Sequence, residues 1–103
     1  MALTKSYRDT VVKRIKGDPA FARALYAEAV SAILDGEAAV GLSQLRDIVH
    51  ALVTFPELAR VTGVPEKSLH RALSAHGNPT TATLGRITSG ISKATGYAPR
   101  FAV

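Results

Sequence analysis

The sequence predicts a compact all-α domain of five or six helices with a short extended tail at its C-terminus. Apolar residues recur every three or four positions through most of the 103 residues, as they do in amphipathic helices. Glycines and prolines divide this pattern into segments of helical length. Hydrophobic residues make up 47% of the chain and charged residues 20%, a balance typical of a globular domain and not of a disordered chain.

The first helix is expected near the N-terminus and should end at Gly17. Ser6 is the expected cap, and Tyr7, Val11 and Ile15 recur every four residues on the apolar side. The basic residues of this segment either form a solvated face or extend the contact with an anionic partner. They are Lys5, Arg8, Lys13, Arg14 and Lys16.

Two longer helices should follow. Asp18 is placed to cap the second helix and Pro19 to occupy its first position, a combination that is typical of helix starts. This helix is expected to run to Gly36, and the third to begin at about Glu37 with a continuous apolar stripe. The stripe consists of Leu42, Leu45, Ile48, Val49 and Leu52.

The second half of the chain predicts shorter helices. Pro56 is expected to open a helix that reaches Val61, and Gly63 to supply the left-handed residue of the turn that follows. Pro65 should begin the next helix. The last helix is expected at about Thr81–Thr95.

Thr80 should cap this last helix and Gly96 should end it. Gly85 and Gly90 inside it each cost roughly 1 kcal/mol relative to alanine, so they indicate close packing between helices or a helix that needs a partner. Apolar and polar residues alternate enough in residues 97–103 for a short strand. A proline among them limits strand pairing, so the segment is expected to be an edge strand or an extended arm.

Charge is distributed unevenly around the net value of +5. Residues 1–17 hold five basic side chains against one acidic one, residues 18–53 hold two against five, and residues 54–103 hold six against two. The basic ends favour an anionic partner, and the acidic middle suggests a separate task. Three acidic residues of the middle fall outside the apolar stripes and are expected on a solvated face. They are Glu28, Asp35 and Asp47.

Several functional classes are not expected. Without cysteine the chain can form neither disulfides nor thiolate zinc sites, which is typical of a cytoplasmic protein. No apolar run resembles a signal peptide or reaches the ~18 residues that span a bilayer. His50, His70 and His76 lack metal-ligand spacing, and His50, beside an apolar stripe, is interpreted as a partly buried structural residue. No nucleophile is paired with a base, so we expect neither an enzyme nor a cofactor.

The segment "ELARVTGVPEKSLHRALS", within about residues 56–74, predicts a helix-turn-helix. Leu69, Ala72 and Leu73 fall on one side of its second helix, which places Lys67 and Arg71 on the opposite side. A short helix, a tight glycine turn and a second helix with a basic outer face can place that helix in the major groove of DNA. A scaffold that touches no nucleic acid can share this spacing, so the pattern alone leaves both readings open.

Nine residues are the candidate DNA contacts. The candidates for bases and nearby phosphates are Glu66, Lys67, Ser68, His70 and Arg71. Among these, Glu66 could accept a hydrogen bond from a cytosine amino group. The candidates for the DNA backbone are Ser74, Asn78, Thr80 and Thr81. Backbone N–H groups at the start of the last helix would add phosphate contacts.

The longer segment "ELARVTGVPEKSLHRALSAHGNPTTATL" contains L-A-x-x-T-G, then S-L-x-R-A-L-S, then G-N-P-T before T-L. With the upstream Asp-Pro cap and Asp-Gly turn, it resembles the addiction-module antidote family over about residues 18–91. These are HigA-like antitoxins with a lambda-repressor-like helix-turn-helix fold. The resemblance implies a homodimer that binds double-stranded operator DNA, represses its own promoter and neutralises a RelE/HigB-like toxin. Pro56 and Pro65 stand where the family usually has serine caps, so a cap contact should be missing there.

The expected organisation has three parts, a basic N-terminal helix at residues 1–17, a helical DNA-binding domain at 18–96 and a C-terminal tail at 97–103. Two alternatives remain beside the antitoxin. One is a stand-alone helix-turn-helix regulator without a toxin. The other is a protein-interaction module without DNA binding, in which the acidic middle, Glu28 through Asp47, docks a basic toxin.

Overall fold

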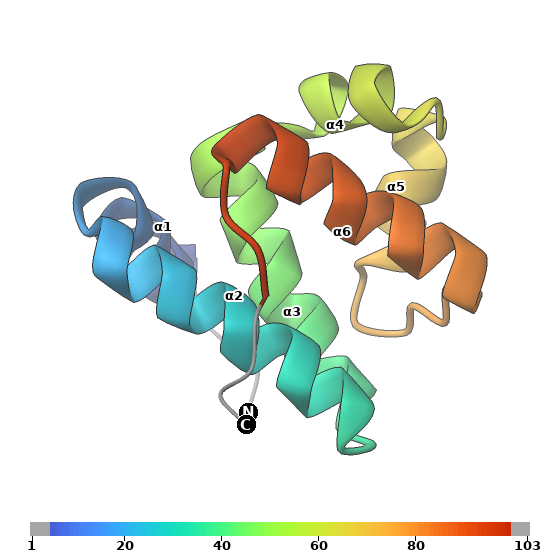
Figure 1. Ribbon diagram of the computed structural model, residues 1–103. Helices are drawn as coiled ribbons and strands as arrows, with labels where there is room; N and C mark the ends of the chain where they lie inside the picture. The colour runs from blue at the N-terminus through green and yellow to red at the C-terminus, as the bar shows by residue number, and fades with distance from the viewer. Residues whose placement is uncertain (1–4, 100–103) are drawn as a thin grey trace.

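The computed structural model describes residues 5–99, and every regular element in that range is helical (Figure 1). The all-α prediction is therefore confirmed for the described chain. The elements are α1 (Lys5–Gly17), α2 (Pro19–Leu34), α3 (Ala38–Ile48), the π-helical turn η1 (Val49–Val53), α4 (Phe55–Thr62), α5 (Glu66–Ala72) and α6 (Thr81–Thr95). No helix of residues 5–99 is long and apolar enough to cross a membrane.

The starts of α2 and α6, which depend on local capping, were predicted well, and the start of α1 was not. The Asp18 carboxylate accepts a hydrogen bond from the Phe21 N–H at 3.1 Å at the start of α2. Thr80 Oγ1 accepts one from the Thr83 N–H at 3.1 Å at the start of α6. The exception is α1, which already includes Ser6, so the expectation that Ser6 caps this helix is wrong.

The end of α3 departs from the expected pattern because the chain widens into the π-helical turn. The Thr54 N–H closes this turn by donating to the Val49 carbonyl at 2.7 Å. Thr54 has φ 80° and ψ 150°, a conformation that strains a β-branched residue. Its Oγ1 accepts a hydrogen bond from the Glu57 N–H at 3.4 Å. Thr54 is thus the cap of α4, and the expectation that a cap contact is missing at Pro56 is wrong. At the start of α5 the expectation is confirmed, because Pro65 is the cap and makes no side-chain hydrogen bond.

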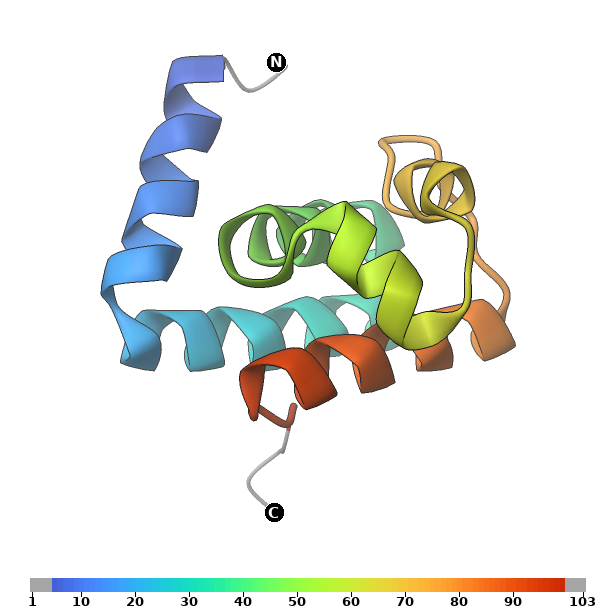
Figure 2. The same cartoon turned by 90° about the horizontal axis from the view of Figure 1, so that it is seen from above.

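The helices α2 and α3 lie side by side and antiparallel, and α1 stands steeply across the start of α2 (Figure 2). Tyr26 ties this pair to α6, since its hydroxyl donates to the Thr88 carbonyl at 2.7 Å and lies 3.0 Å from Ser92 Oγ. Burial raises the pKa of Tyr26. The largest fully buried side chains of the core, besides Tyr26, are Ile15, Leu45, Ile48, Leu58, Leu69, Leu73, Ile87, Ile91 and Val49.

Only one of the two glycines inside α6 marks close packing. A Cβ on Gly90 would lie 2.6 Å from Thr62 Cγ2 and 2.8 Å from Leu58 Cδ1, so α4 crosses α6 at this point. A Cβ on Gly85 would have no neighbour within 4 Å among the described atoms. The packing interpretation is confirmed for Gly90 and wrong for Gly85.

The acidic middle is not uniformly solvated. Glu28 and Asp35 are exposed as expected, but Asp47 is only 6% exposed, and the solvated-face prediction is wrong there. The reason is that α1 packs across α3, which brings Arg8 Nη1 to 2.9 Å from Asp47 Oδ1. Burial raises the pKa of Asp47, and the neighbouring Arg8 only partly opposes this effect.

The C-terminal residues show no strand as far as they are described. Tyr97 packs against the core, and the Arg23 guanidinium carbon lies 5.4 Å from the centre of its ring. Residues 97–99 have no regular structure, and residues 100–103, the rest of the tail expected to be extended, lie outside the described chain.

Candidate nucleic-acid interface

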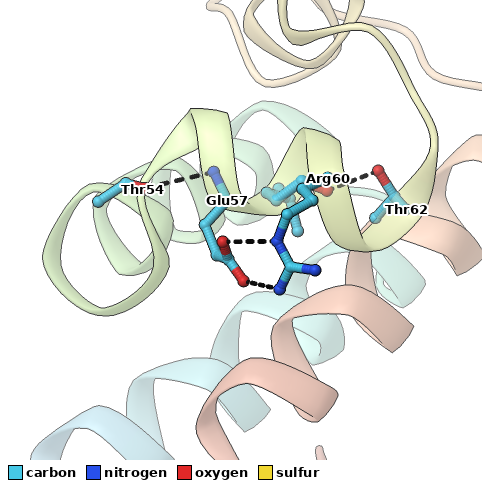
Figure 3. Close-up of polar contacts among 5 residues, drawn as sticks. Thr54, Glu57, Arg60 and Thr62 are labelled. Atoms are coloured by element: carbon cyan, nitrogen blue, oxygen red, sulfur yellow. Dashed lines mark hydrogen bonds and ion pairs between the residues drawn. The ribbon is translucent and has the colours of Figure 1, made fainter.

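The turn between α4 and α5 is tight and held by Thr62. Gly63 adopts φ 74°, as predicted, and its N–H donates to the Ala59 carbonyl at 2.9 Å. Thr62 Oγ1 donates to the Leu58 carbonyl at 2.7 Å within α4 (Figure 3). The same hydroxyl accepts from the Val64 N–H at 3.2 Å, so it ties the last turn of α4 to the loop that leads to α5.

The two sides of α5 are divided as the sequence predicted. Leu69 and Leu73 are buried at 0% and 1% exposure, and Ala72 lies beside them. On the outer side, five of the predicted DNA contacts are exposed. They are Glu66, Lys67, Ser68, His70 and Arg71.

Two of these five form an intramolecular cluster at one edge of α5. The His70 ring stacks on Phe55 with centroids 3.9 Å apart and planes inclined by 14°, and its Nε2 lies 3.3 Å from Glu66 Oε2. His50 packs edge-on against the other side of Phe55 at 4.9 Å. His70 and Glu66, both predicted DNA contacts, are exposed as expected, and each also has a partner within the fold.

His50 keeps an exposed surface but packs against the Phe55 ring, and desolvation by burial lowers its pKa, so the interpretation of a partly buried structural residue is confirmed in part. Sequence reasoning missed Phe55 as a residue that positions α5. Its apolar side chain directly before a Pro-Glu helix start was the available signal.

The remaining outer residues of α5 are available to an anionic ligand. Neither Lys67 nor Arg71 forms an ion pair within the described residues, and both side chains are exposed. Ser68 lies between them in the chain and is also exposed. This combination of two cations and a hydroxyl can donate hydrogen bonds to guanine edges and phosphate oxygens.

A groove of about 380 Å³ separates α5 from the start of α6. Ser68 and Arg71 line it from α5, Asn78 from the connecting loop and Thr83 from α6. His76 also lines it, a residue that the sequence pattern did not single out. The groove thus brings two of the predicted base contacts close to one predicted backbone contact.

The other candidates for contacts with the DNA backbone differ in how available their polar groups are. Thr81 is exposed in the first turn of α6, where its N–H precedes the first intrahelical hydrogen bond and can bind phosphate. The Thr80 hydroxyl is occupied in capping Thr83, to whose Oγ1 it also donates at 3.1 Å. Ser74 is half-buried and donates to the Arg71 carbonyl at 2.8 Å, so its hydroxyl is less available than expected.

An acidic side chain lies close to this surface on α4. The Arg60 guanidinium forms a two-pronged contact with the Glu57 carboxylate, one prong being Nε to Oε2 at 3.0 Å and the other Nη2 to Oε1 (Figure 3). This contact lowers the pKa of Glu57. The charge of Arg60 is therefore already paired with a carboxylate of the same helix.

Among residues 5–99, no three His, Asp or Glu side chains are grouped closely enough to hold a metal ion. No family model, curated protein or solved structure matches this chain.

Proposed function

We propose that this protein is a sequence-specific DNA-binding transcriptional regulator that places α5 in the major groove. The observation that carries the proposal is the division of α5, in which Leu69 anchors one side while Lys67 and Arg71 are exposed on the other and form no ion pair with any residue that the structure describes. The major groove is about 12 Å wide and admits one helix. Gly63 ends α4 in a left-handed conformation, and a tight turn of this kind before the second helix is typical of helix-turn-helix proteins.

In this proposal each predicted contact has a distinct role. Arg71 and Lys67 are the base-reading or phosphate-binding cations, and Ser68 is a short donor between them. Asn78 and the first N–H groups of α6 hold the DNA backbone beside the groove. The Glu66–His70 pair stacks on Phe55 and orients α5, so its primary role is to position the helix.

The wider proposal follows from the motif resemblance. It is a cytoplasmic homodimeric antitoxin that represses its own promoter and neutralises a RelE/HigB-like toxin. A stand-alone regulator with the same DNA-binding surface is the simpler form of the proposal. One observation favours the alternative of a protein-interaction module, an apolar groove of about 480 Å³ between α1, α2 and α3.

The test is a gel shift with a duplex taken from the chain's own upstream promoter, compared with a scrambled duplex over a salt series. Specific binding should be tighter, and log K should fall by about 0.9 per phosphate contact for each tenfold rise in salt. Equal, weak binding to both duplexes would reject sequence-specific recognition.

Arg71→Ala provides the sharper measurement. If Arg71 binds a guanine edge through two hydrogen bonds, the variant should lose roughly 1–3 kcal/mol of specific binding and discriminate less at one base pair. Lys16→Ala is the matched control, since it also removes one exposed charge but lies on α1, at the opposite end of the molecule from α5 (Figure 2). Equal losses in both variants would show that only net charge matters.

A further inference from the structure

The apolar groove of about 480 Å³ lies where α1, α2 and α3 meet, at the end of the molecule away from α5 (Figure 2). All three helices contribute apolar lining, with Tyr7 and Val11 from α1, Phe21 and Leu25 from α2 and Val40 from α3. Tyr7 is 54% exposed and Val40 is 50% exposed, although both side chains are large. Mainly apolar walls and a volume of about 300–1,000 Å³ are typical of sites that bind small molecules.

Two polar side chains of α3, Gln44 and Asp47, line the same groove. They are three residues apart, so they lie on one side of the helix. Among the described residues of the lining Asp47 alone is charged, and its side chain is 9% exposed. Gln44 Oε1 is buried and accepts no hydrogen bond from any described residue. The groove therefore combines apolar walls with one carboxylate and one amide oxygen that lacks a donor.

Arg8 compensates only part of the Asp47 charge. Its Nη1 donates to Asp47 Oδ1 at 2.9 Å, and Asp47 Oδ2 forms no hydrogen bond with the rest of the described chain. Burial raises the pKa of Asp47, because the loss of hydration outweighs the attraction of Arg8. A cation that enters the groove therefore meets a carboxylate that its partner in the fold leaves incompletely stabilised.

We propose that this groove binds a small primary amine with an apolar body, such as an arylalkylamine. The ammonium group carries three donors, of which one pairs with Asp47 Oδ2 and another reaches Gln44 Oε1 after rotation of that amide. The apolar body packs on Phe21 and covers the exposed sides of Tyr7 and Val40. Charge complementarity identifies the amine, since the lining presents a carboxylate in a chain whose net charge of +5 otherwise favours anions. The site does not depend on the proposed DNA binding.

The first experiment titrates the nitrogen-15-labelled full chain near neutral pH and at constant ionic strength, and follows the amide signals by NMR. The probes are 2-phenylethylamine, 2-phenylethanol and phenylacetate, which share a phenyl ring and differ in charge. The amine should bind about tenfold more tightly than the alcohol, as expected of one hydrogen bond to a buried charged group, and the anion should bind most weakly. The signals of Val40 and Gln44 should shift, and those of α5 should stay unchanged.

Three variants test the position of the amine in the groove. Asp47→Asn removes the charge at nearly constant side-chain size, so it should weaken binding of the amine about tenfold and leave binding of the alcohol unchanged. Ala39→Trp should abolish binding of both probes, because Ala39 is exposed and lines the groove, which the larger side chain fills. Ala38→Trp is the matched control, since Ala38 is exposed on the same helix but does not line this groove. Circular dichroism checks that each variant is folded.

The outcomes separate this inference from the proposed function. Preferential binding of the amine that is lost in Asp47→Asn and Ala39→Trp but kept in Ala38→Trp would support the site. Wild-type protein that binds no probe, or binds the alcohol as tightly as the amine, would overturn it without any variant, and the second result would indicate a plain apolar association surface. An Asp47→Asn variant that binds the amine as tightly as the wild type would also overturn it. A chain that binds the amine but no duplex would refute the DNA-binding proposal and leave this site intact.

Discussion

Gly90→Ala tests whether α6 fixes the helix-turn-helix through its contact with α4. A Cβ at this position would lie 2.6 Å from Thr62 Cγ2 and 2.8 Å from Leu58 Cδ1, closer than real Cβ contacts. Thr62 cannot rotate away freely, since its hydroxyl bonds both the Leu58 carbonyl and the Val64 N–H. The added methyl group therefore acts on the residue that brackets the turn.

Two opposing terms decide the magnitude. Alanine is favoured over glycine inside a helix by about 1 kcal/mol. Adding a methyl group to a well-packed contact costs roughly 1–3 kcal/mol. The net effect of Gly90→Ala should be a loss of stability of about 1 kcal/mol, which corresponds to roughly 4–8 °C in Tm for a domain of this size.

Gly85→Ala is the matched control on the same helix. A Cβ there would meet no atom of residues 5–99 within 4 Å, so only the helix-propensity term applies and the variant should gain about 0.5–1 kcal/mol. Urea unfolding followed by far-ultraviolet circular dichroism measures both variants, and the difference between them isolates the contact with α4 at about 1–3 kcal/mol. If Gly90→Ala stabilised the protein as much as Gly85→Ala, the close crossing of α4 and α6 would be refuted.

Three further predictions concern strained or buried groups, each measured by urea unfolding. Because burial raises the pKa of Asp47 above its ordinary 3.8, the ionised carboxylate destabilises the fold above the raised pKa, and this penalty disappears as the pH falls through it. The free energy of unfolding of Asp47→Asn should therefore rise by about 1 kcal/mol near neutral pH, and this gain should disappear toward about pH 4. Arg8→Ala leaves the Asp47 carboxylate without its partner, so it should lose about 1–3 kcal/mol. Tyr26→Phe should lose about 1 kcal/mol with its buried hydroxyl bond. Thr54→Gly should gain about 1 kcal/mol by relieving a positive φ, since a glycine cap costs only a few tenths; a loss would show that the Thr54 cap outweighs its strain.

Elements whose start or end depends on adjacent residues were predictable from the sequence. Asp18 and Thr80 cap the helices they were expected to cap, Gly63 adopts the left-handed conformation expected of it, and Gly96 ends α6 as expected. The energies that decide these positions arise within one helical turn, so the local sequence contains the necessary information.

Features that depend on distant contacts were not predictable in this way. Asp47 is buried because Arg8, 39 residues away, reaches it when α1 packs across α3. A helical stripe shows that a carboxylate lies off the apolar side, but it does not show which helix will cover that side. The π-helical turn was missed for a similar reason, since its closing bond at Thr54 depends on a strained conformation that propensity argues against.

In the candidate site, too, the features that depend on local sequence were predictable and those that depend on distant contacts were not. The anchored side of α5 could be predicted because burial of Leu69 follows from helical periodicity. Which outer side chains remain available to a ligand could not be predicted, since that depends on how α5 packs against α4. At the observed angle His70 covers Phe55 and draws Glu66 toward it, while Lys67 and Arg71 stay outside the cluster.

The orientation of α5 is consequently set by residues that would not touch DNA. Thr54 turns the chain after η1 so that Phe55 is buried at 3% exposure between His50 and His70. Thr62 fixes the other end of α4 against the turn. Because α4 is held at both ends, a change at either end should shift all the outer side chains of α5 together. Substitutions at Phe55 should therefore weaken DNA binding across many base positions, whereas those at Arg71 should act on one.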